Sequence, residues 1–205
     1  MAKHRVRRYG TGALLVECDP DDVPGLLGAI DAHIAEAVEA IPGARSILVR
    51  FDPARGDLRE LAEQLTILEP SAVESRSQSL TWLPVRYQAP DLNTVAGACG
   101  LTVAEVIERH QRPTYTVAFC GFAPGFAYLI GLDPELQIPR RESPRSKVPA
   151  GSVAIAAEYS AVYPQASPGG WHLIGNCSAT LFDVTQPAPA LLVPGSQVRF
   201  EVVGQ

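Results

Sequence analysis

The chain has 205 residues, of which 46% are hydrophobic and 19% are charged, a composition typical of a soluble globular protein rather than a disordered one. Its net charge of −5 argues against nucleic acid as the main partner, because phosphate backbones are bound by broad clusters of cations. No apolar run reaches the roughly 18 residues that a membrane helix needs, and the N-terminus lacks the apolar core of a secretory signal. The sequence therefore predicts a cytoplasmic protein that binds neither nucleic acid nor a membrane.

The first part of the chain alternates extended and helical patterns. Between residues 22 and 41, apolar residues recur at helical spacing, and a Pro-Gly pair follows as a stop signal. The expected elements, in chain order, are strands at 4–9 and 13–18, a helix at 22–41, a strand at 46–52, a helix at 57–68 and extended structure at 73–87. This order predicts an α+β domain with its helices on one face of a sheet.

The composition changes near Trp82. The residues after it hold 13 of the 18 prolines and 11 of the 17 glycines, which is the usage of a strand-and-loop domain. We place the domain boundary after residue 83, so that the predicted domains are 1–83 and 84–205.

Two helices and then several short strands are expected in the second domain. Asp91 can cap a helix at 92–99, and Thr102 with Glu105 forms a capping box for a helix at 103–110. The expected strands lie at 114–120, 152–157, 161–163, 171–174, 178–184, 191–193 and 196–203. Short strands spaced in this way predict a closed or nearly closed β-barrel.

The sequence predicts no metal site. Its cysteines show neither a C-x-x-C pair nor a zinc-type histidine pattern, and we expect ordinary buried thiols at Cys18, Cys99, Cys120 and Cys177. An alternative is a nucleophilic Cys120 activated by His172, although nothing in the sequence brings the two together. The only methionine is Met1, so the chain has no Met-Lys-Met site for biotin attachment.

The stretch 119–176 concentrates glycines, prolines, aromatic residues and cations, as binding loops do. It begins with an aromatic turn in which a Pro-Gly pair favours type II geometry. The aromatic side chains around this turn either line a pocket or fill the core. The candidate pocket residues are Phe122, Pro124, Gly125, Phe126 and Tyr128.

A cationic segment follows, in which three prolines exclude a helix and favour extended backbone. Because arginine forks match carboxylate and phosphate oxygens, the segment is a candidate anion site; a solvated basic loop is the alternative. Its four cations lie within eight residues and are Arg140, Arg141, Arg145 and Lys147.

The third motif reads PGGWHLIGN. Gly169 and Gly170 leave two backbone amides free to face a ligand, and strand alternation puts Trp171 on the face opposite His172. His172 is the candidate catalytic acid–base residue, and Trp171 and Asn176 are candidate substrate contacts together with the two glycines. A structural histidine is the alternative.

These motifs occur in the order GFAPGFAYL, PRRESPRSKVPAGSVAI and VYPQASPGGWHLIG, accompanied by AIPGARSILVRFDP, LPVRY, PDL and LLVPGSQVRF. In that order, along nearly the whole chain, they resemble the allophanate hydrolase subunit 1 family. Its members include the B subunit of the bacterial ATP-dependent 5-oxoprolinase and the Kip-type inhibitors of sporulation histidine kinases. The chain departs from the family pattern at 87–90, where the glycine-rich insertion is missing, and at Cys120 and Cys177.

The resemblance implies a small N-terminal α+β domain and a C-terminal cyclophilin-like β-barrel. It also implies an allophanate hydrolase subunit 2-type partner, the two proteins together being similar to the carboxyltransferase region of urea carboxylase. The 5-oxoprolinase version needs a LamB/YcsF-type subunit as well.

The resulting functional hypothesis is a subunit of an ATP-dependent 5-oxoprolinase, which hydrolyses 5-oxo-L-proline to L-glutamate and is inactive without its partner subunits. ATP is the expected cofactor of the complex, with the subunit that binds it left open. The alternatives are a Kip-type inhibitor of a sensor histidine kinase, a subunit of another urea- or amide-type carboxyltransferase or hydrolase, and a prolyl isomerase. We further expect the three motifs to share one face that a partner subunit completes.

Overall fold

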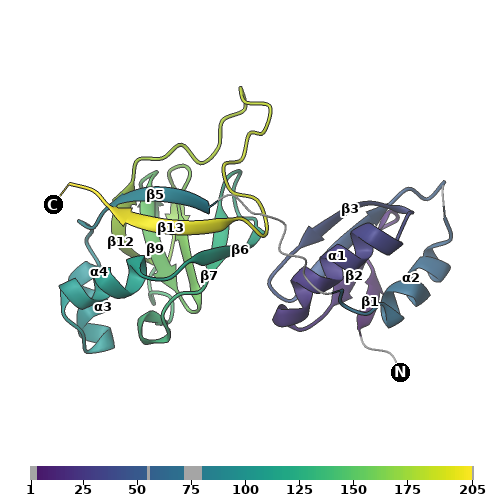
Figure 1. The fold of residues 1–205 in the computed structure, drawn as a ribbon, viewed down its shortest axis with the longest axis horizontal. Helices are drawn as coiled ribbons and strands as arrows, with labels where there is room; N and C mark the ends of the chain where they lie inside the picture. Colours follow the sequence, from purple (N-terminus) through teal and green to yellow (C-terminus); the bar gives the residue numbers. More distant parts are fainter. Residues whose placement is uncertain (1–3, 55, 72–79, 205) are drawn as a thin grey trace. The chain divides into compact units, whose positions relative to one another are not determined.

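A computed structural model describes residues 4–54, 56–71 and 80–204 (Figure 1). The chain forms two compact units, Met1–Ser77 and Gln78–Gln205. The division lies before the boundary predicted after residue 83, because strand β5 (Leu80–Arg86) pairs with strands of the second unit. Much of the extended segment predicted at 73–87 falls outside the described residues.

The first unit is a four-stranded antiparallel sheet in the order β1-β2-β4-β3. Both helices pack on one face of this sheet, because the alternate residues Leu14, Val16, Ile47 and Val49 share a single apolar core with them. The elements are β1 (Arg5–Arg8), β2 (Ala13–Glu17), η1 (Pro20–Asp22), α1 (Val23–His33), β3 (Ala37–Pro42), β4 (Ser46–Phe51) and α2 (Leu58–Ile67). The α+β architecture is confirmed.

The helix predicted at 22–41 is wrong in its second half. Helix α1 ends at His33, and Ile34 leaves the helical region with φ −108° and ψ 86°. Residues 37–42 then form β3, an edge strand on which Val38 is 60% exposed. The spacing of apolar residues matched a helix, but pairing with β4 decides the conformation of this β-branched segment.

The second unit is a closed barrel of seven strands in the order β10-β7-β6-β13-β5-β12-β9, which confirms the predicted barrel. Its strands are β5, β6 (Tyr115–Cys120), β7 (Ala127–Ile130), β9 (Ser152–Ala156), β10 (Tyr159–Val162), β12 (His172–Cys177) and β13 (Gln197–Val202). The first and last of them, β5 and β13, lie side by side and are parallel (Figure 1).

Helices and a small side sheet complete the second unit. Helix α3 (Leu92–Cys99) and helix α4 (Val103–Gln111) lie together below the barrel in Figure 1, and the predicted capping box of Thr102 and Glu105 is present. The remaining elements are η2 (Pro134–Leu136), β8 (Arg145–Val148) and β11 (Ser167–Gly169), the last two forming a two-stranded sheet.

The strands predicted at 178–184 and 191–193 are wrong. These residues belong to the long yellow-green loop before β13 in Figure 1, where a single bridge joins Phe182 to Ala190. Prolines at 187, 189 and 194 interrupt the ladder, since proline has no backbone N–H to donate.

His110 of α4 is fully buried and links the helix to the barrel. Ser160 Oγ donates its proton to the Ala154 carbonyl at 3.4 Å. It therefore accepts a hydrogen bond from His110 Nε2 at 2.8 Å, so Nε2 carries the ring proton. His110 Nδ1 in turn accepts from Tyr87 Oη at 2.7 Å. Burial lowers the pKa of His110 to about 3. The ring is thus a neutral structural bridge.

Among the residues described, no helix combines the length and the hydropathy needed to cross a membrane.

Candidate functional site

The aromatic turn has the predicted geometry. Gly125 has φ +82°, and the Phe126 N–H donates to the Ala123 carbonyl at 2.9 Å, as in a type II turn with Pro124 at its second position. A Cβ on Gly125 would lie 2.7 Å from Phe182 Cβ. Glycine is therefore required both by the turn and by the loop packed against it.

Phe126 is the centre of an aromatic cluster that joins the first and third motifs. Its ring is 2% exposed and meets the rings of Tyr128, Tyr163 and Trp171 edge-on, at centroid distances of 5.0, 5.2 and 5.8 Å. This geometry is favourable for aromatic pairs. For Phe126 the core alternative is correct, whereas Phe122 stays at the surface.

Phe122 combines exposure with backbone strain. Its side chain is 61% exposed, and its φ of 69° places a bulky residue in the left-handed region that favours glycine. Its ring still meets Phe126 and Tyr163 edge-on. Strain of this kind concentrates at functional sites.

Replacing Phe122 with glycine is expected to leave the barrel unit about 1 kcal/mol more stable than replacing it with alanine. Both variants lose the ring, but only glycine also lacks the Cβ that disfavours this backbone conformation. The measurement is urea unfolding followed by tryptophan fluorescence, which reports on this unit because Trp82 and Trp171 both lie in it. Equal stabilities would show that the turn relaxes once the ring is gone.

The cationic segment lies against the aromatic cluster. The Arg140 guanidinium lies 5.8 Å from the centre of the Trp171 ring, within the range of a cation–π contact. The Arg141 N–H donates to the Gly170 carbonyl at 2.8 Å. The structure therefore brings together parts of all three motifs, whereas Lys147 is exposed on β8.

Asp91 organises two of the arginines. Its Oδ1 accepts from Arg141 Nη1 at 3.0 Å and from Arg145 Nη2 at 2.6 Å, while its Oδ2 accepts from the Leu173 N–H at 2.7 Å. The aspartate precedes α3 as predicted, but its side chain makes no capping hydrogen bond, so that role is wrong. Both carboxylate oxygens are engaged by partners from later in the chain.

The charge state of Asp91 follows from these contacts. Burial alone would raise the pKa of its carboxyl, but the hydrogen bonds from Arg145 and Leu173, with the charges of Arg145 and Arg141, outweigh burial and hold the pKa below its usual value. The cluster is thus a buried carboxylate between two guanidinium groups. Sequence reasoning missed it because the partners are 50 and 54 residues away.

Unpaired polar atoms gather around this cluster. Among the described residues, five buried side-chain nitrogen or oxygen atoms have no hydrogen-bond partner. Four of the five belong to the cationic segment or to the neighbouring strands β11 and β12: Arg141 Nε, Arg145 Nη1, Ser167 Oγ and His172 Nδ1. Such groups are rare in folded proteins and call for a functional explanation.

His172 is the first residue of β12 and is half-buried, whereas Trp171, the residue before the strand, is 4% exposed. Its Nε2 is 3.0 Å from the Pro139 carbonyl oxygen, and since a carbonyl only accepts, Nε2 carries the proton and Nδ1 holds a free lone pair. Cys120 is not its partner, because the thiol contacts the Leu192 carbonyl at 3.7 Å and burial raises its pKa. This excludes the predicted alternative of an activated thiolate in this conformation.

The other predicted site residues serve different needs. A Cβ on Gly169 would lie 2.3 Å from Tyr163 Oη, so a close side-chain approach requires this glycine. Asn176 is exposed on β12, where it pairs with Arg86 and Ser152 rather than with residues of the cluster. Of the cysteines only Cys177 is buried, and the other three are half-buried rather than buried as predicted.

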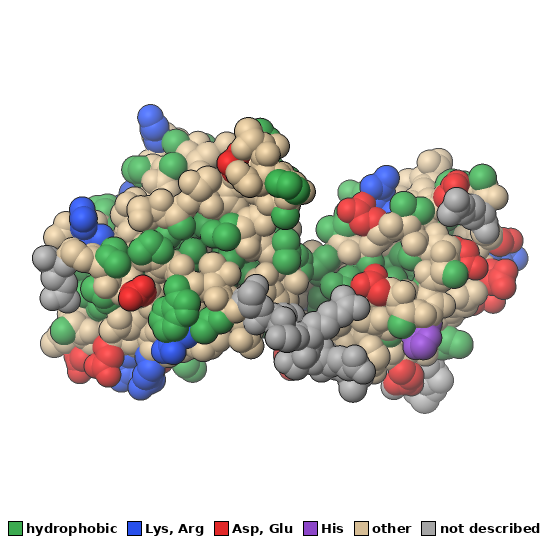
Figure 2. Space-filling model, turned by 45° about the horizontal axis from the view of Figure 1, so that its top comes forward, with side chains coloured by type: hydrophobic (Ala, Val, Ile, Leu, Met, Phe, Trp, Pro, Cys, Tyr) green, Lys and Arg blue, Asp and Glu red, His purple; other side chains and the backbone are tan. Residues whose placement is uncertain are grey.

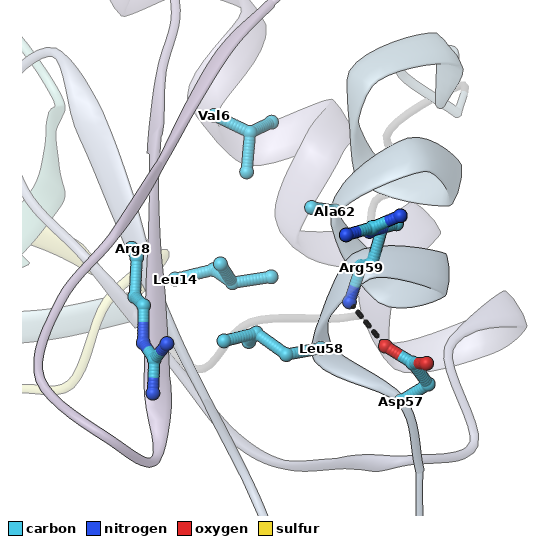
Figure 3. A pocket seen from close by; sticks show the side chains of 7 residues that line it. All are labelled: Val6, Arg8, Leu14, Asp57, Leu58, Arg59 and Ala62. Carbon is cyan, nitrogen blue, oxygen red and sulfur yellow. Dashed lines mark hydrogen bonds between the residues drawn. The ribbon is translucent and has the colours of Figure 1, made fainter.

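Two shallow hollows lie in the first unit, which contains none of these motifs. The larger has a volume of about 570 Å³ and lies beside Tyr9 and Val38. The other has a volume of about 430 Å³ and opens between β1, β2 and α2, with apolar side chains converging and Asp57 holding the Arg59 N–H (Figure 3). That carboxylate is used as a helix cap. We therefore take the aromatic and arginine cluster of the barrel unit as the candidate site.

Solved structures share this fold. The crystal structure of TTHA0988 aligns with a TM-score of 0.80 at 31% identity, covering 95% of this chain and 40% of that one. The urea carboxylase of Kluyveromyces lactis aligns with a TM-score of 0.74 at 22% identity, covering 99% of this chain and 22% of that one. The chain thus spans less than half the length of either solved protein.

Sequence comparison gives the family. The 5-oxoprolinase B subunit from Escherichia coli O157:H7 is 45% identical over 168 residues, which cover 80% of this chain and 77% of the relative. Residues 4–192 match the model of the carboxyltransferase domain, subdomains C and D. The resemblance predicted from the ordered motifs is confirmed, and the chain belongs to the carboxyltransferase domain family, subdomains C and D.

Proposed function

We propose that the chain is the B subunit of an ATP-dependent 5-oxoprolinase, a complex that hydrolyses 5-oxo-L-proline to L-glutamate. The observation that carries the proposal is the match to three relatives named as B subunits of 5-oxoprolinase, which are 34–45% identical over 80–97% of the chain. The alternative of kinase inhibition stays a prediction.

The reaction needs an activated carbonyl, a site for an anionic group and a proton acceptor. A lactam carbonyl is a poor electrophile, so the complex would use ATP to phosphorylate the lactam oxygen and release ADP. One water would then open the C–N bond to give an acyl phosphate, and a second water would release phosphate and L-glutamate. The arginines then hold an anionic part of the substrate, either its carboxylate or the phosphorylated oxygen. The free lone pair of His172 Nδ1 makes this atom the candidate proton acceptor.

An uncovered apolar surface supports pairing with a subunit 2-type protein and with a LamB/YcsF-type subunit. Phe122 lies on the aromatic turn, and the loop packed against that turn carries the exposed residues Val184, Leu191 and Val193. Figure 2 shows hydrophobic side chains exposed in several places on the barrel unit. Exposed apolar patches mark interaction sites, and TTHA0988 has further chain beyond the part matched here.

The test is reconstitution. The chain is mixed with the two partner subunits, and 5-oxoproline-dependent ATP hydrolysis is measured together with glutamate formation. We expect turnover that needs every subunit. If the complete complex assembles and neither product forms, the proposed function is wrong.

A further inference from the structure

We infer that Arg141 and Arg145, held in place by Asp91, bind the carboxylate of the substrate rather than a phosphate. The inference rests on the proposed function and assigns the ligand class of one part of its site. In this arrangement Asp91 is a positioning residue, and the two arginines are the binding groups.

The first argument is the shape of the cluster. Both guanidinium groups donate to one oxygen of Asp91, so they are fixed beside each other. The unpaired atoms, Arg141 Nε and Arg145 Nη1, therefore lie within about 5 Å of that oxygen, given roughly 2.3 Å between nitrogens of one planar guanidinium. Each guanidinium thus keeps N–H groups that Asp91 does not engage, and forked N–H donors of this kind suit the two oxygens of a small anion.

The second argument is access. The Asp91 side chain is 3% exposed, whereas the side chains of Arg141 and Arg145 are 31% and 22% exposed. The carboxylate thus closes the inner side of the cluster and the arginines face outward. Parts of both arginine side chains are therefore at the surface, where the charge of a ligand meets them, whereas the unpaired atoms Arg141 Nε and Arg145 Nη1 are buried behind them.

The third argument is charge. Two guanidinium groups and one ionised carboxylate leave a single net positive charge in the cluster. A monoanionic carboxylate neutralises it, whereas a phosphate dianion would leave a net negative charge beside a buried aspartate, which is unfavourable. The charge of these three groups taken together therefore favours a carboxylate such as that of 5-oxoproline.

The test compares Arg141→Lys and Arg145→Lys in the reconstituted complex. Each variant keeps the positive charge next to Asp91 but loses the planar fork and an unpaired N–H. We expect the KM for 5-oxoproline to rise roughly 10-fold or more, while the KM for ATP stays unchanged. Arg109→Lys is the matched control, because Arg109 pairs with the buried Asp133 in the same unit, and it is expected to change neither constant.

Equilibrium binding to the assembled complex separates this inference from the proposed activity. Binding of 5-oxoproline is compared with that of 2-pyrrolidinone, the same lactam without a carboxylate. We expect the carboxylate to strengthen binding in the wild type and not in the lysine variants, whether or not turnover occurs. A rise in the KM for ATP, an equal effect of Arg109→Lys, or carboxylate-dependent binding that survives in both variants would overturn the inference.

Discussion

Replacing Phe126 with alanine is expected to destabilise the barrel unit by about 3 to 5 kcal/mol. The ring is 2% exposed and contacts four other aromatic rings, so its loss leaves a cavity where the aromatic turn meets β12. Urea unfolding followed by tryptophan fluorescence measures the change, and Trp171 sits in the wall of the cavity.

Phe122→Ala is the matched control, because Phe122 belongs to the same turn and has the same side chain but is 61% exposed. Its replacement is expected to change the free energy of unfolding by less than about 1 kcal/mol. If both substitutions lowered the free energy of unfolding by several kcal/mol, the Phe122 ring would be part of the core. It would then not be available to contact a partner.

Lowering the pH from 7 to 5 is expected to reduce the free energy of unfolding of the barrel unit by about 2 kcal/mol. The pKa of His110 is about 3 in the folded protein and about 6.5 in an unfolded chain, so below pH 6.5 only the unfolded state gains a proton. Stability is therefore complete above pH 6.5 and falls steadily as the pH drops towards 3. Urea unfolding at several pH values measures this slope.

His110→Gln is expected to remove the contribution of about 2 kcal/mol that His110 makes to the slope between pH 7 and 5. The carboxyls of Asp91 and Asp133, whose pKa values lie below the usual 3.8, add to the pH dependence only under more acidic conditions. If the wild type were equally stable at pH 7 and 5, His110 would have to be protonated in the folded state, which contradicts its neutral hydrogen-bonding role.

The sequence correctly predicted the structural elements that depend on contacts between residues close together in the chain. The capping box at Thr102, the type II turn before Phe126 and the strand β6 all follow from side chains a few residues apart. The segment 37–42 and the loop before β13 were mispredicted because strand pairing and prolines, rather than hydrophobic spacing, decide them.

The candidate site shows the same limit. The sequence identified the arginines and the aromatic residues by their density, and the order of the motifs identified the family. It could not reveal Asp91 as the partner of Arg141 and Arg145, because an aspartate before a helix has the appearance of a cap, and the three residues meet only in the tertiary fold of the second unit. The position of His172 against Pro139 depends on the same closure.

The parallel pairing of β5 with β13 has a consequence for biosynthesis. The seam of the barrel joins residues 80–85 to residues 197–202, so the ring cannot close until nearly the whole second unit has left the ribosome. The first unit, whose strands pair within residues 5–51, can fold while the rest is still being translated. Until β13 is made, the edges of β5 and β6 that pair with it have no hydrogen-bond partners. Removing β13 would leave these edges exposed and is expected to promote aggregation.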